Sequence, residues 1–269
     1  MPSLPERLWN TSPASLARAL ARRWERWTAR PGWHRVQAGP LAGTELFFDS
    51  LLLPAWREMV AGTFDAFLHQ ELRTRRTVEG TVCWDVGAHF GYHSLALAAQ
   101  GAQVVAFEPN MHNAARLRDN LARNPALAAR VRLRPEALSD REGTLEFVQS
   151  ADLDETSSGS HLAAGTPPSA GSVYEHFQHV TVSCARADSL IAGGEAPPAV
   201  MKIDVEGAEL LVLEGARDLL RRHKPLLLME VHHIRLMFHL RPLLEGCGYR
   251  LLLADEAHAE PSRCFVVAE

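Results

Sequence analysis

Apolar and polar positions predict strands and helices in regular alternation from about residue 81 onward. Short apolar runs predict strands at residues 81–86, 103–107, 131–134, 200–203, 226–230, 249–253 and 264–267. Apolar residues at helical spacing predict helices at 94–99, 209–222 and 234–245. This alternation is typical of an α/β protein with a Rossmann-like doubly wound, mostly parallel sheet, and the closeness of the last two strands predicts that the final strand is reversed.

The first 75 residues do not follow this alternation. Residues 34–49 predict a hairpin around a Gly-Pro turn, and residues 54–72 predict one helix. Residues 4–30 are rich in Arg and Trp, and Leu16, Leu20 and Trp24 lie at helical spacing. We expect a helix that packs across the domain, with a membrane-surface helix as the alternative. The chain thus divides into an N-terminal helical and hairpin extension, 1–75, and a sheet domain, 76–269.

Residues 150–179 interrupt the alternation with Ser, Gly, Ala, Pro, Thr and His, between strands predicted at 144–148 and 180–185. A loop of this length in a compact domain is either functional or disordered. We expect a lid or a substrate-facing insertion, with a featureless linker as the alternative. This loop, the N-terminal helix and the helix at 236–244 are expected to shape a substrate pocket.

The composition is that of an ordinary globular protein, with 46% hydrophobic and 22% charged residues. The net charge of −4 gives no electrostatic footprint for nucleic acid. No apolar run approaches the ~18 residues that span a membrane. Cys83, Cys184, Cys247 and Cys264 are widely spaced, which predicts buried free thiols in a cytoplasmic protein.

A glycine turn follows the first strand of the predicted sheet. Asp85, Gly87 and Gly91 lead from that strand into a helix, and Glu108 follows the next strand. Nucleotide-binding folds have this order of strand, glycine turn, helix, strand and acid. In these folds the acid accepts hydrogen bonds from the ribose hydroxyls. The sequence therefore predicts a nucleotide-type cofactor site.

The spacing of this turn argues against a dinucleotide. The chain has D-x-G-A-x-x-G, whereas a dinucleotide site needs G-x-G-x-x-G against the pyrophosphate. A carboxylate at Asp85 would repel a pyrophosphate but suits a ligand that carries an ammonium group. S-adenosylmethionine combines an adenosine with an amino-acid end, so it is the predicted cofactor. His89 lies within reach of this ligand.

Further polar residues follow two later strands. Asp204 ends the strand at 200–203, and Glu230 and His232 end the strand at 226–230. Because ligands bind outside the carboxyl ends of parallel strands, these side chains are expected on the same edge as Asp85 and Glu108. His232 and Glu230 share one side of their strand, which predicts an imidazole oriented by that carboxylate.

Two acids and one histidine near this second motif have less certain roles. Glu206 and Glu209 lie where a helix begins, and acids in a first helical turn are also common without any function. His233 should face away from His232, which favours a structural role.

The motifs together resemble the FkbM family of S-adenosylmethionine-dependent methyltransferases. The resemblance lies in D-V-G-A-H-F-G-Y-H-S (85–94), F-E-P-N (107–110), A-L-S-D (137–140), K-I-D-V-E-G-A-E (202–209) and E-V-H (230–232), with weaker matches at 39–43 and 62–65. The family usually has Asn in place of His89 and Tyr-Glu in place of Phe64-Asp65. The resemblance implies a class I methyltransferase fold with a seven-stranded sheet.

The resemblance also assigns residues to parts of the cofactor. Gly87, Ala88 and Gly91 would hold its methionine part, and Glu108 its ribose. Pro109, Asn110, Ala137 and Leu138 would lie beside the adenine, and Asp204 and Val205 would line the methyl-transfer cleft. The full set expected to bind the cofactor is Asp85, Gly87, Ala88, His89, Gly91, Ser94, Glu108, Pro109, Asn110, Ala137, Leu138, Asp204 and Val205.

The implied reaction is methylation of a hydroxyl group on a sugar, a polyketide or a similar natural product, as a small molecule or a glycan. Asp204 and His232 are the candidate bases, with Glu230 orienting the imidazole. A divalent metal at Asp204, Glu206, Glu230 and His232 is a minor possibility, because carboxylate and imidazole suit Mg²⁺ or Zn²⁺. The alternatives are a non-catalytic S-adenosylmethionine-binding scaffold or sensor and, less favoured, an NAD-type oxidoreductase.

Overall fold

The structure is a computed structural model that describes residues 31–49, 51, 53–150, 161–162, 177–253 and 264–269. The helix expected over residues 4–30 lies outside the described residues, as does most of the loop expected over 150–179. The division of the chain at residues 75 and 76 stays a prediction.

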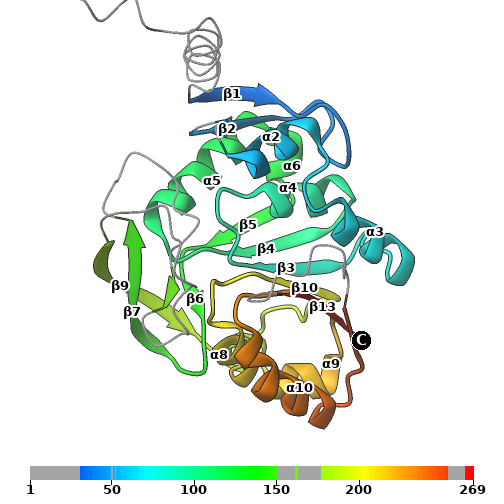
Figure 1. The fold of residues 1–269 in the computed structure, drawn as a ribbon, viewed down its shortest axis with the longest axis vertical. Helices are drawn as coiled ribbons and strands as arrows, with labels where there is room; N and C mark the ends of the chain where they lie inside the picture. The colour runs from blue at the N-terminus through cyan, green and yellow to red at the C-terminus, as the bar shows by residue number, and fades with distance from the viewer. Residues whose placement is uncertain (1–30, 50, 52, 151–160, 163–176, 254–263) are drawn as a thin grey trace, which may run out of the picture.

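Among the described residues, seven strands form one sheet in the order β12-β13-β11-β10-β3-β4-β5 (Figure 1). These strands are β3 (Val82–Val86), β4 (Gln103–Phe107), β5 (Val131–Arg134), β10 (Val200–Ile203), β11 (Leu226–Val231), β12 (Leu251–Leu253) and β13 (Cys264–Ala268). Strands β11, β10, β3, β4 and β5 are parallel, whereas β13 is antiparallel to both of its neighbours. The predicted doubly wound sheet with a reversed last strand is confirmed.

Helices cover both faces of this sheet. The helices of the described residues are α2 (Pro54–Ala61), α3 (Ala66–Arg75), α4 (Tyr92–Ala99), α5 (Met111–Arg123), α6 (Pro125–Ala128), α7 (Ala187–Ala192), α8 (Glu209–Glu214), α9 (Arg217–His223), the 3-10 helix η2 (Ile234–Leu236) and α10 (Met237–Gly246). Successive strand residues point to opposite faces. Trp84 and Met201 therefore pack against α7 to α10, and Cys83 and Val200 pack against α3 and α4. The resulting two apolar layers fix the sheet edge that carries the site.

The hairpin expected near the N-terminus is confirmed. Strands β1 (Gly32–Arg35) and β2 (Glu45–Phe48) pair antiparallel and lie beyond α5 (Figure 1). Phe48 packs against Trp56 and Phe90, with ring centroids 6.3 and 5.6 Å away. Asn120 accepts the N–H of Phe47 and donates to the carbonyl of Phe90. The hairpin is thus joined to the segment that follows β3.

The single helix predicted over residues 54–72 was wrong, because the chain forms α2 and α3 with a turn between them. Gly62 ends α2 at φ +79°, in the left-handed region that glycine adopts easily. A Cβ there would lie 2.0 Å from the carbonyl oxygen of Ala38, so the loop before β2 presses directly on this turn. The helical spacing of apolar residues carries no signal for this tertiary contact.

The helix predicted over residues 209–222 is also two helices, α8 and α9. The carboxylate of Asp188 accepts the N–H groups of Asp218 and Leu219, at 3.2 and 2.9 Å. These two donors belong to the first turn of α9, where no partner exists within the helix. A side chain from α7 thereby stabilises a new helix start in the middle of the periodic segment.

A second sheet lies beside the first. It contains β6 (Ala137–Leu138), β9 (Phe177–Ala185), β7 (Gly143–Ser150) and β8 (His161–Leu162), in that order. Both of the strands predicted on either side of the 150–179 loop are therefore present and are longer than predicted. The loop prediction was wrong at residues 150, 161–162 and 177–179, which lie in strands because β7 extends to Ser150 and pairs with both β8 and β9.

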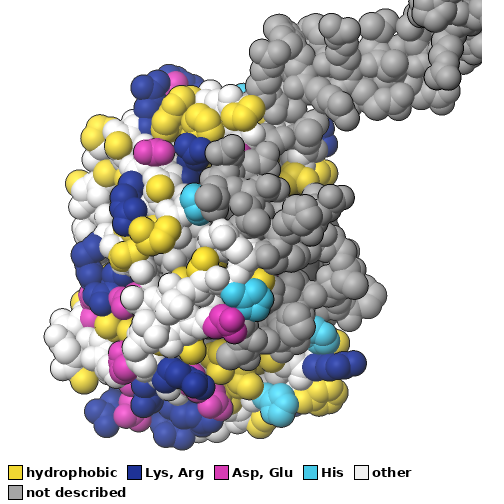
Figure 2. All heavy atoms as spheres, turned by 90° about the vertical axis from the view of Figure 1, so that its left-hand side faces the viewer, with side chains coloured by type: hydrophobic (Ala, Val, Ile, Leu, Met, Phe, Trp, Pro, Cys, Tyr) yellow, Lys and Arg dark blue, Asp and Glu magenta, His cyan; other side chains and the backbone are white. Residues whose placement is uncertain are grey.

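The four cysteines are buried and free, as the sequence predicts. Within the described residues, no helix is long and apolar enough to cross a membrane. The face shown in Figure 2 carries acidic and basic side chains side by side rather than charges of one sign.

Candidate active site

A cavity of about 400 Å³ lies at the carboxyl ends of β3, β4, β10 and β11. Residues from the segments that follow each of these strands line it, together with side chains from α2 and from the second sheet. This is the edge at which open α/β sheets bind ligands, and the volume falls within the range of small-molecule sites, roughly 300–1,000 Å³.

The glycine turn after β3 forms one wall of the cavity. The N–H groups of Gly87 and Ala88 both donate to the carbonyl of Phe107, at 3.0 Å each. Gly87 has φ +79°, and a Cβ on it would lie 1.8 Å from the carbonyl oxygen of Asp204. Only glycine fits where the turn passes so close to the end of β10. Hydrogen bonds and close packing therefore fix the wall between two neighbouring strands.

Glu108 follows β4 directly, and its carboxylate lies against this turn. Its Oε2 accepts the N–H of His89 at 2.7 Å, and its Oε1 accepts the N–H of Asn110 at 2.9 Å. The side chain is buried but lines the cavity. Burial raises the pKa of Glu108 to about 7, because the charged form loses water that these donors only partly replace.

The predicted cofactor residues fall into two groups. Those that line the cavity are Gly87, Ala88, His89, Glu108, Pro109, Ala137, Leu138, Asp204 and Val205. Those that lie behind its wall are Asp85, Gly91, Ser94 and Asn110. Asn110 caps α5 by accepting the N–H groups of His112 and Asn113, which explains its burial.

The carboxylate of Asp85 differs from our expectation that it faces the ligand. It is fully buried, and its Oδ2 accepts the hydroxyl of Ser94 at 2.6 Å. Its Oδ1 lies 3.4 Å from Nζ of Lys202. Since both oxygens face groups beneath the turn, Asp85 supports the glycine turn and does not contact the cavity.

Lys202 is a cavity residue that our sequence reasoning missed. Its Nζ donates to the carbonyl of Gly87 at 3.1 Å and to Oδ2 of Asp204 at 3.2 Å. Burial alone would lower the pKa of Lys202, but the charges of Asp204 and Asp85 outweigh burial and hold it above its usual value. The signal in the sequence was its position in β10, two residues before Asp204 and therefore on the same side of the strand.

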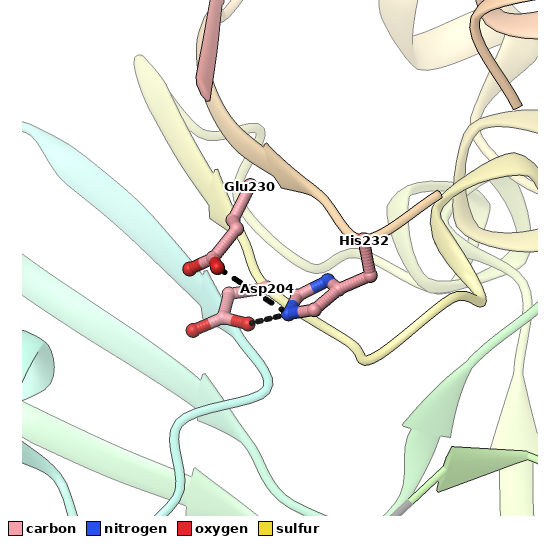
Figure 3. Close-up of side chains that lie close together, drawn as sticks. All are labelled: Asp204, Glu230 and His232. Atoms are coloured by element: carbon pink, nitrogen blue, oxygen red, sulfur yellow. Dashed lines mark ion pairs between the residues drawn. The ribbon is translucent and has the colours of Figure 1, made fainter. Parts of the chain in front are cut away.

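Figure 3 shows Asp204, Glu230 and His232 converging from the ends of β10 and β11. The Nε2 atom of His232 lies 3.5 Å from Oδ1 of Asp204 and 3.5 Å from Oε1 of Glu230. Glu206, held at φ +51°, brings its Oε2 to 3.4 Å from the same nitrogen. All four side chains line the cavity that also contains Glu108. The structure thus brings together the residues predicted at the ends of these two strands.

The residue that orients the imidazole is Glu209, so our assignment of this role to Glu230 was wrong. Oε1 of Glu209 lies 2.8 Å from Nδ1 of His232 and also accepts the N–H of Gly207 at 3.1 Å. Glu230 faces the other ring nitrogen. The side chain of Glu209 at the start of α8 reaches β11 because Val205 to Ala208 turn the chain back toward that strand.

The surrounding carboxylates set the charge of His232. Burial lowers its pKa, but the hydrogen bond that Nδ1 donates to Glu209 and the nearby carboxylates outweigh burial and raise the pKa to about 10. For Asp204, burial is outweighed by Lys202 and His232, which lower its pKa to about 2. The protonated imidazole can donate a proton or hydrogen bond, whereas the carboxylates can accept one. His233 caps η2 by accepting the N–H of Arg235, in line with its expected structural role.

Part of the apolar wall of the cavity comes from a segment that sequence reasoning did not assign to it. Leu53, Trp56 and Met59, at and around α2, line the cavity. The helix expected there, residues 236–244, contributes no lining side chain within the described part of the chain. That expectation was wrong because Leu240 and Leu244 of α10 are buried in the core on one face of the sheet.

The fold and the position of this cavity define a Rossmann-like α/β protein whose ligand site lies at the carboxyl edge of the sheet. The sequence profile of the methyltransferase FkbM domain matches residues 85–251, more than half of the chain. This chain belongs to the FkbM methyltransferase family.

Two of the known proteins that are similar to the chain show how far the likeness extends. The hexuronic acid methyltransferase AglP of Haloferax volcanii is 33% identical over 155 residues, which are 57% of this chain and 57% of AglP. A crystal structure of methyltransferase FkbM from Methylobacillus flagellatus superimposes with a TM-score of 0.50 at 19% identity, over 70% of this chain and 43% of that one. The chain therefore spans about half the length of these relatives, and the structural likeness supports the fold.

Proposed function

We propose that this protein transfers a methyl group from S-adenosylmethionine to a hydroxyl group of a sugar or a similar natural product, such as a polyketide. The observation that carries the proposal is that one cavity contains both Glu108 and the Asp204–Glu230–His232 group. Family membership supports methyl transfer, and the hexuronic acid named for the relative from Haloferax volcanii supports a sugar acceptor.

The cavity fits the proposed cofactor. Glu108 is the buried acid at the second strand, and it lines the cavity, where its carboxylate would accept ribose hydroxyls. Ala137 and Leu138 supply an apolar wall beside it for an adenine. Bound there, S-adenosylmethionine supplies a methyl group on a positively charged sulfur, which is a strong methyl donor. The protein then has to place an acceptor oxygen in line with that methyl group.

The acceptor would lie between the cofactor and the polar residues at the ends of β10 and β11. We assign to Asp204 the role of accepting the proton of the acceptor hydroxyl, because its carboxylate lines the cavity and is fixed by Lys202. The protonated His232 would donate a hydrogen bond to the acceptor oxygen, with Glu230 beside the imidazole. General-base assistance of this kind contributes about 10²–10⁴-fold to a rate.

A transfer assay tests the proposal. The full-length protein is incubated with methyl-labelled S-adenosylmethionine and a panel of glycosides, with matched hexuronic acid and neutral hexose members. We expect label in at least one glycoside, at an oxygen atom identified by mass spectrometry and NMR. Label on nitrogen, or no label in any acceptor when S-adenosylhomocysteine binds, would contradict the assignment of O-methylation.

A further inference from the structure

The two nitrogens of the His232 imidazole differ in their surroundings. Nδ1 is hydrogen-bonded to Glu209, whereas Nε2 makes no hydrogen bond within the described residues. Three carboxylate oxygens nevertheless surround Nε2 at 3.4–3.5 Å. Because N–H···O hydrogen bonds measure 2.7–3.2 Å, these separations are too long for direct bonds. The side chain is only 9% exposed and lines the cavity.

The distances between Nε2 and these carboxylate oxygens are similar to those between ligand atoms that coordinate one cation. Divalent Mg²⁺ and Zn²⁺ bind oxygen and imidazole nitrogen at about 2.1 Å, so two ligands of one ion lie at most about 4.2 Å apart. Nε2 of His232 is 3.5 Å from Oδ1 of Asp204 and 3.5 Å from Oε1 of Glu230. One ligand atom from each of these three residues lies within 4.8 Å of the others. Small rotations of two carboxylates would complete a three-ligand site.

The environment of the three residues also suits a cation. Histidines that bind metals generally donate the other ring N–H to a carboxylate, and Glu209 is in that position at 2.8 Å. Glu209 is fully buried, and its Oε2 has no hydrogen-bond partner within the described residues. Nζ of Lys202 lies 3.4 Å from Oδ1 of Asp85 and 3.2 Å from Oδ2 of Asp204, on the side of Asp204 away from the imidazole.

We propose that Asp204, Glu230 and His232 form a binding site for one divalent metal ion, with Glu209 positioning the imidazole. The mixed oxygen and nitrogen ligand set accepts Mg²⁺, Mn²⁺ or Zn²⁺, and binding of the ion to Nε2 of His232 releases the proton of that nitrogen to solvent. The site faces the cavity, so water or an acceptor hydroxyl can complete the coordination of the ion. A metal-bound hydroxyl has a lowered pKa, which would assist its deprotonation. This last role rests on the proposed methyl transfer, whereas ion binding does not.

Mn²⁺ is the probe for the test. The full-length protein is stripped with EDTA and titrated with Mn²⁺, and the free ion is measured by electron paramagnetic resonance. We expect one saturable site per chain. Affinity should fall at least about tenfold in Glu230→Gln, which removes a ligand charge, and about 10- to 100-fold in Glu209→Gln, which alters the partner of Nδ1. Glu214→Gln changes an exposed acid at the far end of the same helix and should bind Mn²⁺ like the wild type.

The controls separate this proposal from the proposed function. Melting curves verify that each variant is folded, and titration with S-adenosylhomocysteine measures the cofactor site on the same samples. Saturable binding to the wild type that weakens in Glu230→Gln supports the metal site. No saturable binding to folded wild type, or equal binding in wild type and Glu230→Gln, overturns it. If S-adenosylhomocysteine still binds in that case, the proposed function stands without the metal.

Discussion

The backbone N–H of His89 donates a 2.7 Å hydrogen bond to Oε2 of Glu108. This bond joins the glycine turn after β3 to the acid after β4, so the wall and the predicted ribose-binding acid of the cavity form one unit. His89 adopts φ +51° to place its N–H there, a backbone conformation that is uncommon outside glycine. Gly87, in the same turn, and Glu108 are therefore the positions at which the cofactor proposal is tested most directly.

Replacing Glu108 with Ala should weaken the binding of S-adenosylhomocysteine by ~1–3 kcal/mol, because ribose hydroxyls and the N–H of His89 lose their acceptor. Calorimetric titration measures the change. Asp119→Asn, an exposed acid on the helix that follows, is the matched control and should bind like the wild type. Unchanged binding in Glu108→Ala would show that the ribose lies elsewhere.

Cofactor affinity should depend on pH through Glu108. Burial raises the pKa of this carboxyl to about 7, so it is protonated below that pH and ionised above it. The ionised form accepts stronger hydrogen bonds from ribose hydroxyls. Affinity for S-adenosylhomocysteine should therefore rise as the pH increases through about 7 and then level off. Titrations across this range should show the rise in the wild type and lose it in Glu108→Gln; an identical rise in both proteins would assign it to another group.

Replacing Gly87 with Ala should destabilise the whole protein. The added Cβ would lie 1.8 Å from the carbonyl oxygen of Asp204, and φ +79° is strained for alanine. The left-handed conformation alone costs about 1–3 kcal/mol, and the backbone clash adds to this. The free energy of unfolding, from urea denaturation, is the readout.

A second glycine provides the control. Gly246 ends α10 with nothing within 4 Å of its Cβ position, so Gly246→Ala should be neutral or stabilising by up to about 1 kcal/mol. Equal stabilities of the two variants would mean that the turn after β3 is looser than described.

Replacing Asp204 with Asn should lower the rate of methyl transfer by about 10²–10⁴-fold and leave the binding of S-adenosylhomocysteine largely unchanged. Asparagine keeps the shape of the side chain but cannot accept the proton of the acceptor. Lys202 retains Asp85 as a charged partner, which limits the loss of stability. Single-turnover rates and calorimetry on the same preparation give the two readouts. Full activity in Asp204→Asn would remove this residue from the reaction.

Local signals in the sequence were sufficient for the main sheet. The inner strands of its parallel core are short, mostly apolar runs buried on both faces, such as Val200–Ile203, and this pattern is typical of parallel strands. The polar residues at strand ends, including Glu108 and Asp204, could be assigned to one edge because parallel strands end on the same side.

Contacts between distant segments could not be predicted in the same way. Gly62 lies against the loop before β2, and Asp188 of α7 accepts N–H groups at the start of α9. Each contact divides a predicted helix in two, and helical periodicity contains no information on either contact. The sequence pointed to Glu230 as the partner of the His232 imidazole, whereas Glu209 is the partner of Nδ1. This difference also arises from a contact between distant segments. Spacing along β11 places Glu230 beside the imidazole, but the turn before α8 brings Glu209 closer.

Titration of the full-length protein with S-adenosylhomocysteine in a calorimeter tests the central claim most directly, with NADH as the parallel ligand. The account predicts saturable binding of S-adenosylhomocysteine at one site per chain, weakened in Glu108→Ala, and no binding of NADH. A folded protein that fails to bind S-adenosylhomocysteine, or that binds NADH instead, would contradict the assignment of a methyltransferase.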